Sequence, residues 1–366
     1  MKKKLFLATA FVCFLIAASV PSISSACTDF QVKASDGSVI IGRSMEFAVD
    51  VKSQILVNPR GEREEGGAPD GGPGLTWTSK YGYLSVNAFG IDELVIDGMN
   101  EAGLSIEGLW LPGTVYQSVS KKQMRRAINA GRLGAWILAS FKNVGEVRKA
   151  LGGVRVWLGV VPQLGIVAPV HFAVHDADGK NIVIEFIGGE IKIHDNPVGV
   201  MTNAPSFDWH MTNLRNYVNL SPDNAGRLEL GGTAFTKTGN GSGMLGVPGD
   251  FTPPSRFVRT AMLAHFSNKP KDAPGGVNLA AHILNSVDIP RGSVNDREKS
   301  LNAEDYTQWV IIKDLTGRVL YVRCYDGMAF RKIELNKLSF EKGVKTKSVV
   351  IESAVMGVID ITGDLL

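Results

Sequence analysis

Cysteine is scarce in this 366-residue sequence, which contains only Cys13, Cys27 and Cys324. No cysteine or histidine cluster has the short spacing of a zinc site, and the six histidines are scattered. His171 and His175 lie four positions apart, but they flank apolar residues of an expected strand, so a metal site there is weakly supported. We therefore expect a protein that needs no metal and no cofactor.

Long apolar runs are also missing after the first 20 residues. The N-terminus has the three parts of a secretory signal: a basic start at residues 2–4, an uncharged run at 5–20, and small residues Ser24 and Ala26. The run spans roughly 16 residues, fewer than the roughly 20 that a bilayer requires, so cleavage is favoured over a membrane anchor. We expect residues 1–26 to be removed and 27–366 to form a single domain, in the periplasm or secreted.

The sequence also lacks a large excess of positive or negative charge. The 39 basic residues include the leader's three lysines, so 36 basic residues remain beside 36 acidic ones. A mature chain near neutrality, without a basic block, argues against nucleic acid or an anionic membrane surface as a partner. We expect no stable membrane association.

Cleavage after Ala26 makes Cys27 the first residue of the mature chain. It then carries a thiol and a free α-amine, whose pKa near 8 allows it to take the thiol proton. The resulting thiolate is a nucleophile. Two alternatives remain: a disulfide with Cys324, which an exported protein permits, and lipid modification of Cys27. A lipoprotein typically has Leu three residues before the cysteine, where this chain has Ser24.

The segment after Cys27 predicts a β-hairpin of residues 28–32 and 38–43, because Asp36-Gly37 is a strong turn signal. A two-residue loop there places Cys27 opposite Glu46 and pairs Arg43 with Phe30, so that Arg43 points to the other face. One bulge would exchange the two faces. In either register both charges lie near the strand end that carries Cys27.

Strands and helices are expected in separate blocks. Such blocks predict antiparallel sheets covered by helices, an α+β arrangement in layers. Residues 59–74 are expected to form a surface loop, and the glycine-rich residues 239–243 favour a flexible loop over a phosphate-binding one. Asn143 is the expected N-cap of a helix ending at Leu151, and Trp209, Leu214 and Tyr217 are the expected apolar anchors of another. Strands are predicted at 75–78, 83–88, 94–99, 104–109, 170–175, 182–187, 190–194, 198–201, 308–313 and 319–325, and helices within 121–151 and at 205–217, 254–266 and 276–287.

Several separated motifs resemble those of the choloylglycine hydrolases, the family of penicillin V acylases and bile salt hydrolases. The motifs lie at residues 27–28, 42–47, 97–104, 108–112, 201–207, 245–250, 255–259 and 307–309. The resemblance covers nearly all of the mature chain and implies the four-layer αββα sandwich of N-terminal nucleophile hydrolases. By resemblance, the protein is a homo-oligomer, commonly a tetramer, that acts on a small-molecule amide.

The resemblance also implies roles for individual residues. Cys27 is the nucleophile and, through its amine, the base, and Arg43 stabilises the thiolate. Asn203 donates to the oxyanion, and Arg256 orients the site and balances its charge, although a surface ion pair is its alternative. Two positions depart from the family pattern. Glu46 stands where relatives usually have Asp to hold the Cys27 amine, and Trp110 stands where relatives carry Asn or Tyr beside the oxyanion hole.

The sequence thus predicts an exported hydrolase of a linear, non-peptide C–N amide that acts through a thioester. The aromatic residue at position 110 resembles the acylases of Gram-negative bacteria, which favours penicillin V or N-acyl amides as substrates. Conjugated bile salts are the alternative substrates. A non-catalytic lipoprotein or binding module on the same scaffold is the alternative from a different class.

Overall fold

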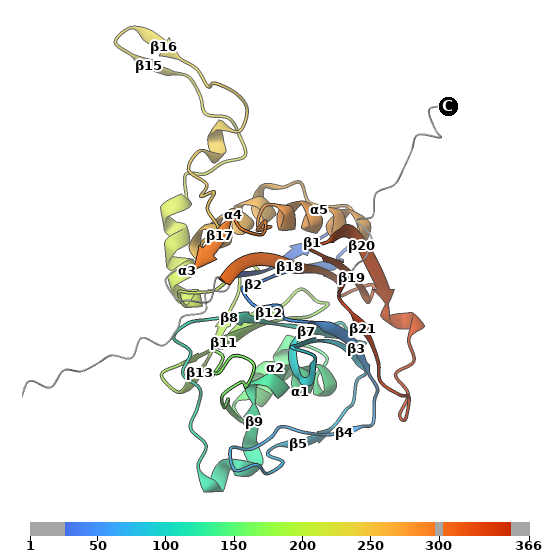
Figure 1. The fold of residues 1–366 in the computed structure, drawn as a ribbon. Helices are drawn as coiled ribbons and strands as arrows, with labels where there is room; N and C mark the ends of the chain where they lie inside the picture. The colour runs from blue at the N-terminus through green and yellow to red at the C-terminus, as the bar shows by residue number, and fades with distance from the viewer. Residues whose placement is uncertain (1–25, 297–302, 353–366) are drawn as a thin grey trace, which may run out of the picture.

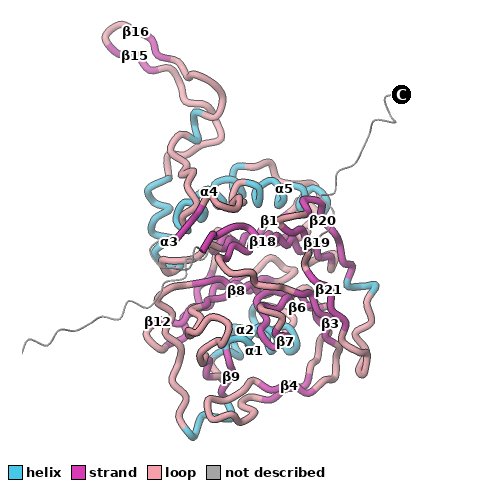
Figure 2. The backbone as a smooth tube through the Cα atoms, in the orientation of Figure 1, coloured by secondary structure: helices cyan, strands magenta, loops and turns pink. Residues whose placement is uncertain are grey.

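The computed structural model describes residues 26–296 and 303–352. Two antiparallel sheets lie face to face at its centre, and helices cover their outer faces, which gives four layers (Figure 1). Figure 2 shows the same order, with the strands in the middle and the helices on the two outer sides. The predicted α+β class and the αββα sandwich are confirmed.

The first sheet has the order β14-β1-β2-β18-β19-β20, with β17 paired to β18, and α4 and α5 pack on its outer face. The second has the order β13-β12-β11-β8-β7-β6-β3-β21, and α1 packs on its outer face against β7 and β8. The first sheet and its helices comprise β14 (Val200–Met201), β1 (Cys27–Lys33), β2 (Val39–Phe47), β18 (Ala303–Asp314), β19 (Val319–Cys324), β20 (Gly327–Glu334), β17 (Val294–Asp296), α4 (Pro253–Phe266) and α5 (Ala273–Asn285). The second sheet and the helices on its side comprise β13 (Glu190–Asp195), β12 (Asn181–Ile187), β11 (Val170–His175), β8 (Ser105–Trp110), β7 (Ile91–Asn100), β6 (Tyr83–Ala88), β3 (Gln54–Asn58), β21 (Lys347–Val350), α1 (Ala130–Ser140) and α2 (Val144–Leu151).

Strand β2 is buried along its whole length, because α5 covers one face and the second sheet faces the other. Gly42 in this strand pairs with Phe30 of β1, and a Cβ at position 42 would lie 2.4 Å from the Phe30 ring. A glycine is needed there so that the aromatic ring can lie over the backbone of the neighbouring strand.

The β1–β2 hairpin differs from the predicted register by one residue. Cys27 pairs with Met45 and Asp29 pairs with Arg43, because the loop has three residues, Ser35 to Gly37. Gly37 has φ +93°, which is typical of the last residue of such a loop. The two-residue loop was therefore wrong. The consequence is favourable for the site, since Arg43 now shares a face with Cys27 and Glu46 lies on the other face.

Other expectations need smaller corrections. The chain does not close with two strands, because β20 and β21 follow β19. The helix expected at 205–217 is split into α3 (Phe207–Asn213) and a 3₁₀ turn, η2 (Leu214–Tyr217). Its buried anchors are Phe207 and His210, whereas Trp209 is 43% exposed. The region 121–151 begins with the 3₁₀ turn η1 (Lys121–Arg126), and Asn143 caps α2 as predicted.

Three short strand pairings of the described residues lie outside the two sheets: β4 (Arg63–Glu65) with β5 (Thr76–Thr78), β9 (Ala127–Asn129) with β10 (Arg155–Trp157), and β15 (Leu228–Leu230) with β16 (Thr233–Phe235).

The strands β15 and β16 form an arm that stands away from the layered body (Figure 1). Residues 239–243 lie in the same exposed region, as a loop that leads into the 3₁₀ turn η3 (Ser242–Met244). Within residues 26–296 and 303–352, we find no helix with the length and apolarity to cross a membrane. The predicted signal peptide lies outside the described residues, apart from Ala26.

Candidate active site

Cys27 is the first residue of β1 and is 2% exposed. Its Sγ lies 3.9 Å from the Met45 Sδ and 3.8 Å from the Glu46 carbonyl oxygen, both on the neighbouring strand β2. The described chain continues through Ala26, so the Cys27 nitrogen is a peptide N–H here. Neither described cysteine is in a disulfide, so Cys27 and Cys324 are not joined.

Arg43 lies on the Cys27 side of β2 and is fully buried. Its Nη2 donates to the Gly108 carbonyl oxygen of β8 at 2.8 Å, and its Nη1 donates to the Ser44 carbonyl oxygen. Burial alone would lower the pKa of Arg43, but attraction to Cys27 and Asp97 outweighs it and raises that pKa. The guanidinium is therefore a permanent positive charge next to the thiol.

Asn203 contacts Cys27 through the side-chain amide oxygen. Its Oδ1 accepts the Cys27 N–H at 2.7 Å and an N–H of Arg256 Nη2 at 2.7 Å. Its Nδ2 donates to the Trp110 carbonyl oxygen at 2.8 Å. Since arginine can only donate, the oxygen of the amide must face Arg256. Asn203 thus connects Cys27 to the strand end that carries Trp110.

Arg256 is fully buried in α4, so it is no surface ion pair. Its Nη1 donates to the Cys27 carbonyl oxygen at 2.5 Å and to the Thr28 Oγ1 at 2.7 Å, and its Nε donates to the Phe251 carbonyl oxygen at 2.9 Å. These contacts hold the first residue of β1 from the helix side.

Glu46 lies on the face of β2 that is turned away from the Cys27 thiol. Its Oε1 accepts the Thr307 hydroxyl at 2.8 Å. Burial raises the pKa of Glu46 to about 7, although Arg256 and Arg43 favour the ionised form. At neutral pH this carboxyl group is near its midpoint, so it can hold or release a proton.

A cavity opens beside Cys27, with an empty volume of about 680 Å³. Among the described residues that line it, every side chain other than Cys27 is apolar or glycine. Trp110 and Phe47 both line it and meet edge to face, with ring centroids 5.5 Å apart. The Trp110 indole therefore forms part of the pocket wall.

The comparisons with known proteins agree with this geometry. Residues 27–351 match the model of the linear amide C–N hydrolases of the choloylglycine hydrolase family. The chain belongs to this family. Membership makes it a hydrolase of linear C–N amides and confirms the resemblance read from the motifs.

Relatives of two kinds are found for this choloylglycine hydrolase. It is 33% identical to the bile salt hydrolase/transferase of Clostridium perfringens, over 85% of this chain and 93% of the relative. It is 29% identical to the penicillin V acylase of Pectobacterium atrosepticum, over 69% of this chain and 64% of the acylase. The crystal structure of a variant of the conjugated bile acid hydrolase from Clostridium perfringens has a TM-score of 0.79, with 30% identity, and covers 92% of this chain and 100% of that one.

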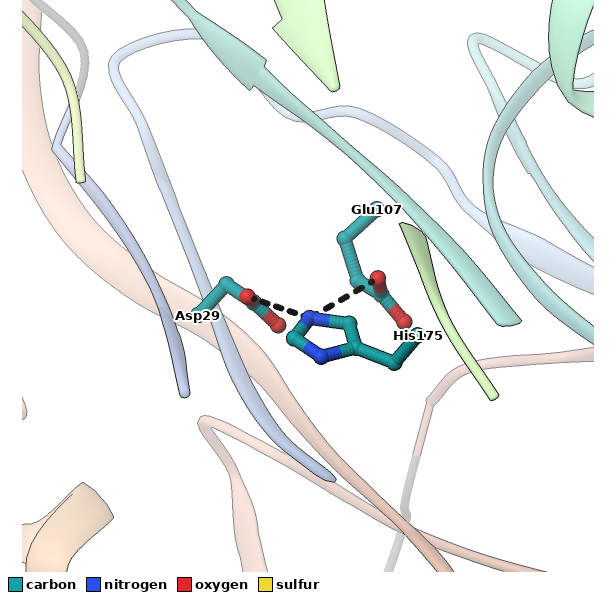
Figure 3. Close-up of side chains that lie close together, drawn as sticks. All are labelled: Asp29, Glu107 and His175. Carbon is teal, nitrogen blue, oxygen red and sulfur yellow. Dashed lines mark hydrogen bonds and ion pairs between the residues drawn. The ribbon is translucent and has the colours of Figure 1, made fainter. Parts of the chain in front are cut away.

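Sequence reasoning missed a buried ionic network in this hydrolase, between the two sheets. The Nζ of Lys313 lies 2.7 Å from Asp97 and 2.6 Å from Glu107, and all three side chains are fully buried. His175 lies 2.9 Å from Asp29 and 3.7 Å from Glu107 (Figure 3). Asp29, Glu107 and His175 are close enough to ligate a metal ion, but Lys313 already places a positive charge against Glu107. The cluster is therefore best explained as an ion-pair network.

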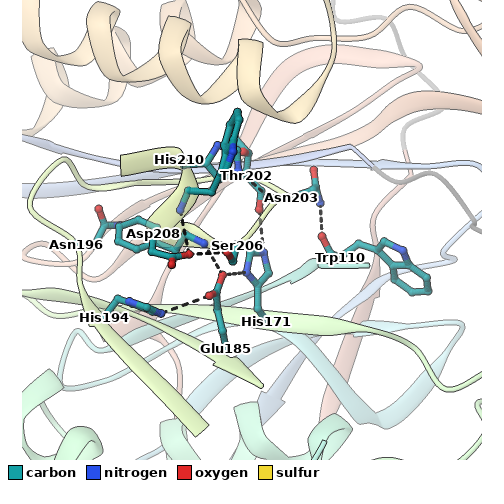
Figure 4. A network of polar contacts seen from close by, with 12 residues as sticks. Trp110, His171, Glu185, His194, Asn196, Thr202, Asn203, Ser206, Asp208 and His210 are labelled. Atoms are coloured by element: carbon teal, nitrogen blue, oxygen red, sulfur yellow. Dashed lines mark hydrogen bonds and ion pairs between the residues drawn. The ribbon is translucent and has the colours of Figure 1, made fainter. Parts of the chain in front are cut away.

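A second network surrounds the turn that carries Asn203 (Figure 4). His171 contacts the Thr202 carbonyl oxygen and Glu185, and His210 contacts the Asn203 carbonyl oxygen. The sequence showed these histidines only as scattered residues. Their spacing carried no signal, because the folding of β11, β12 and α3 brings them together.

Proposed function

We propose that Cys27, exposed as the N-terminal residue after loss of residues 1–26, is the nucleophile of amide hydrolysis. The thiolate attacks the amide carbonyl carbon, a C–S bond forms, and the carbonyl electron pair moves to oxygen. The C–N bond then breaks, and the amine leaves with the proton held by the Cys27 ammonium. Water adds to the thioester, the C–S bond breaks, and the acid leaves while the proton returns to the cysteine.

The contacts around Cys27 support roles for the other residues. Arg43 stabilises the thiolate, because it is a buried cation on the same face. Asn203 has a second Nδ2 hydrogen beyond the one given to Trp110, and this N–H stabilises the oxyanion. Arg256 holds the Cys27 carbonyl and Asn203 in place. Glu46 stabilises the N-terminal ammonium from the helix side.

The observation that carries the proposal is the meeting of three separate segments at one buried cysteine. Cys27 lies at the wall of a cavity, with Arg43 from β2, Asn203 from the turn after β14 and Arg256 from α4 around it. Cys27→Ser is expected to abolish amide cleavage and to leave the fold intact. Retained cleavage would mean that another group is the nucleophile.

The lining of the cavity supports a substrate with an apolar acyl group. The side chains available to bind that group offer no charge and few polar atoms, so hydroxyl groups entering the cavity would lose hydrogen bonds to water. This favours phenoxyacetyl amides such as penicillin V, or long-chain N-acyl amides such as acyl-homoserine lactones. Conjugated bile salts are the second candidate, because of the 33% identity to a bile salt hydrolase/transferase.

A hydrolysis panel separates these candidates. It contains penicillin V, acyl-homoserine lactones, and glycine- and taurine-conjugated bile acids, each tested with the wild type and Cys27→Ser. We expect the first two classes to be cleaved faster. Faster cleavage of the bile acids would establish the second candidate, and inactivity on all of them would favour a non-catalytic binding module.

Export and removal of residues 1–26 belong to the same proposal. Intact mass of the protein recovered from the periplasm or medium is expected to match a start at unmodified Cys27. A diacylglyceryl adduct would instead identify a lipoprotein, whose blocked sulfur could not act as a nucleophile.

We also propose that the arm of β15 and β16 joins copies of this chain. Leu228, Leu230 and Phe235 share one face of this ribbon and are each more than half exposed. A two-stranded ribbon alone is marginally stable in water, so this face needs a covering surface. Light scattering is expected to show an oligomer for the wild type and smaller species for Leu228→Ser/Phe235→Ser. A monomeric wild type would refute the assembly.

A further inference from the structure

The turn that presents Asn203 is held by side chains outside the reacting centre. Asn203 contacts the Cys27 N–H and Arg256 through Oδ1, so the position of this side chain sets where its Nδ2, the proposed oxyanion donor, lies relative to Cys27. Two consecutive backbone carbonyl groups of this turn, those of Thr202 and Asn203, are held by side chains from other elements. Each accepts a hydrogen bond at 2.9 Å from a buried histidine, His171 in the first case and His210 in the second (Figure 4).

The far end of the turn is held through Glu185. The Phe207 N–H donates to Glu185 Oε1 at 2.8 Å, and the same oxygen lies 3.3 Å from His171 Nδ1. Burial would raise the pKa of Glu185, but hydrogen bonds from His171 and His194 hold it at about 2. One ring nitrogen of His171 faces the Thr202 carbonyl oxygen, and the other faces the Glu185 carboxylate. His171 and Glu185 thus form one unit that fixes both ends of the turn to the second sheet.

His210 connects the turn to α4. Its ring stacks on Phe257, the residue after Arg256, with centroids 4.6 Å apart and planes 13° apart. Burial lowers the pKa of His210 to about 4, so the ring is neutral at pH 7 and its proton is on Nε2, which faces the carbonyl. Its Nδ1 has no hydrogen-bond partner among the described residues. One ring therefore contacts the Asn203 backbone on its edge and the Arg256 helix on its face.

We propose that His210 is a positioning residue for Asn203, and that the Nε2–H bond to the Asn203 carbonyl aligns the oxyanion donor with the Cys27 thiol. This inference rests on the proposed function of Asn203. Loss of the bond allows the turn to shift, which lowers the rate of the chemical step. Binding of the acyl group and the reactivity of the thiol do not depend on it, because the cavity and Arg43 lie elsewhere.

The test compares His210→Gln with His210→Asn. The amide nitrogen of glutamine reaches the position of Nε2, whereas that of asparagine reaches the position of Nδ1. We expect kcat to fall between about tenfold and 100-fold in His210→Asn, with KM unchanged, and to recover in His210→Gln. Alkylation of Cys27 by iodoacetamide is expected to proceed at the wild-type rate in both variants. His282→Asn, at an exposed position of α5, is the matched control.

A role in folding alone predicts that both variants lose activity in proportion to their stability, and this result would overturn the proposal. Hydrogen exchange of residues 203–207 gives a readout that needs no substrate. We expect faster exchange in His210→Asn than in His210→Gln, and equal exchange in the two variants would also overturn it. If the wild type cleaves no amide but the two variants still show this difference in exchange, the proposed function is refuted. The positioning of the turn by His210 is then established without it.

Discussion

Removal of the Lys313 charge is expected to destabilise the fold strongly, and more at high pH than at low pH. In Lys313→Met, the carboxylates of Asp97 and Glu107 lose the ammonium group that lies 2.7 and 2.6 Å away, with all three side chains fully buried. Breaking a buried ion pair by removal of one partner costs about 3–5 kcal/mol. We expect a loss of this size in the free energy of unfolding at pH 8.

The pH dependence follows from the carboxyl groups. Burial already raises the pKa of Asp97 to about 6 and also raises that of Glu107, and removal of Lys313 raises both further. A carboxyl group with a raised pKa in the folded state favours folding at low pH, and this contribution is lost as the pH rises through that pKa. The penalty in Lys313→Met is therefore smaller at pH 5, where the carboxyl groups can take up protons.

Urea unfolding at pH 5 and pH 8 measures both effects. The matched control is Lys332→Met, because Lys332 forms an ion pair of the same 2.7 Å length with Glu334 but its side chain is 60% exposed. Such exposed pairs contribute about 0–1 kcal/mol. The double variant Lys313→Met/Glu107→Gln is expected to recover part of the loss. A buried, charge-neutralising role for Lys313 is refuted if Lys313→Met is as stable as Lys332→Met at pH 8, or if its loss of stability is the same at both pH values.

Three further predictions concern the site and the strands beside it. Asn203→Ala is expected to lower kcat by about 10²–10³ in steady-state assays, without slowing the alkylation of Cys27; an unchanged kcat would exclude Asn203 as oxyanion donor. Gly42→Ala is expected to lower the free energy of unfolding by about 1–3 kcal/mol, measured in urea, because the added Cβ meets the Phe30 ring. In the control Gly226→Ala the added Cβ meets open space, and a smaller loss is expected. The raised pKa of Glu46, about 7, stabilises the fold at low pH, and this contribution is lost as the pH rises through 7. The difference in the free energy of unfolding between wild type and Glu46→Gln is therefore expected to change between pH 5 and pH 8. A constant difference would contradict the raised pKa.

Local sequence signals were sufficient for most of the secondary structure. The strand predicted at 83–88 matches β6, and the strand predicted at 170–175 matches β11. The side chain of Asn143 caps α2 because an N-cap depends only on the adjacent turn. Periodicity and capping act over a few residues, so the chain displays them directly.

The failures concern features that depend on contacts between distant segments or on one residue of loop length. The hairpin register was wrong by one residue, because Asp36-Gly37 fits both a two-residue and a three-residue loop. The exposed strand β20 was missed because it has little apolar alternation. Asp97, Glu107 and Lys313 come from three strands in two sheets, so only the pairing of the sheets reveals their network.

The candidate site was predicted in part, through the motifs around its residues. Cys27, Arg43, Asn203 and Arg256 do come together, although no sequence spacing required it. The positions of Glu46 and Trp110 could not be derived, because each depends on which face of a strand a residue occupies. Their roles remain predictions.

The central claim is that the Cys27 sulfur carries the acyl group during turnover. Mass spectrometry of the mature protein, quenched in acid during cleavage of an N-acyl amide, tests this directly. We expect a chain that begins at Cys27, with the mass of the acyl group added and mapped to the N-terminal peptide, and no adduct in Cys27→Ser. An adduct on another residue, or a Cys27 that already carries a lipid, would contradict it.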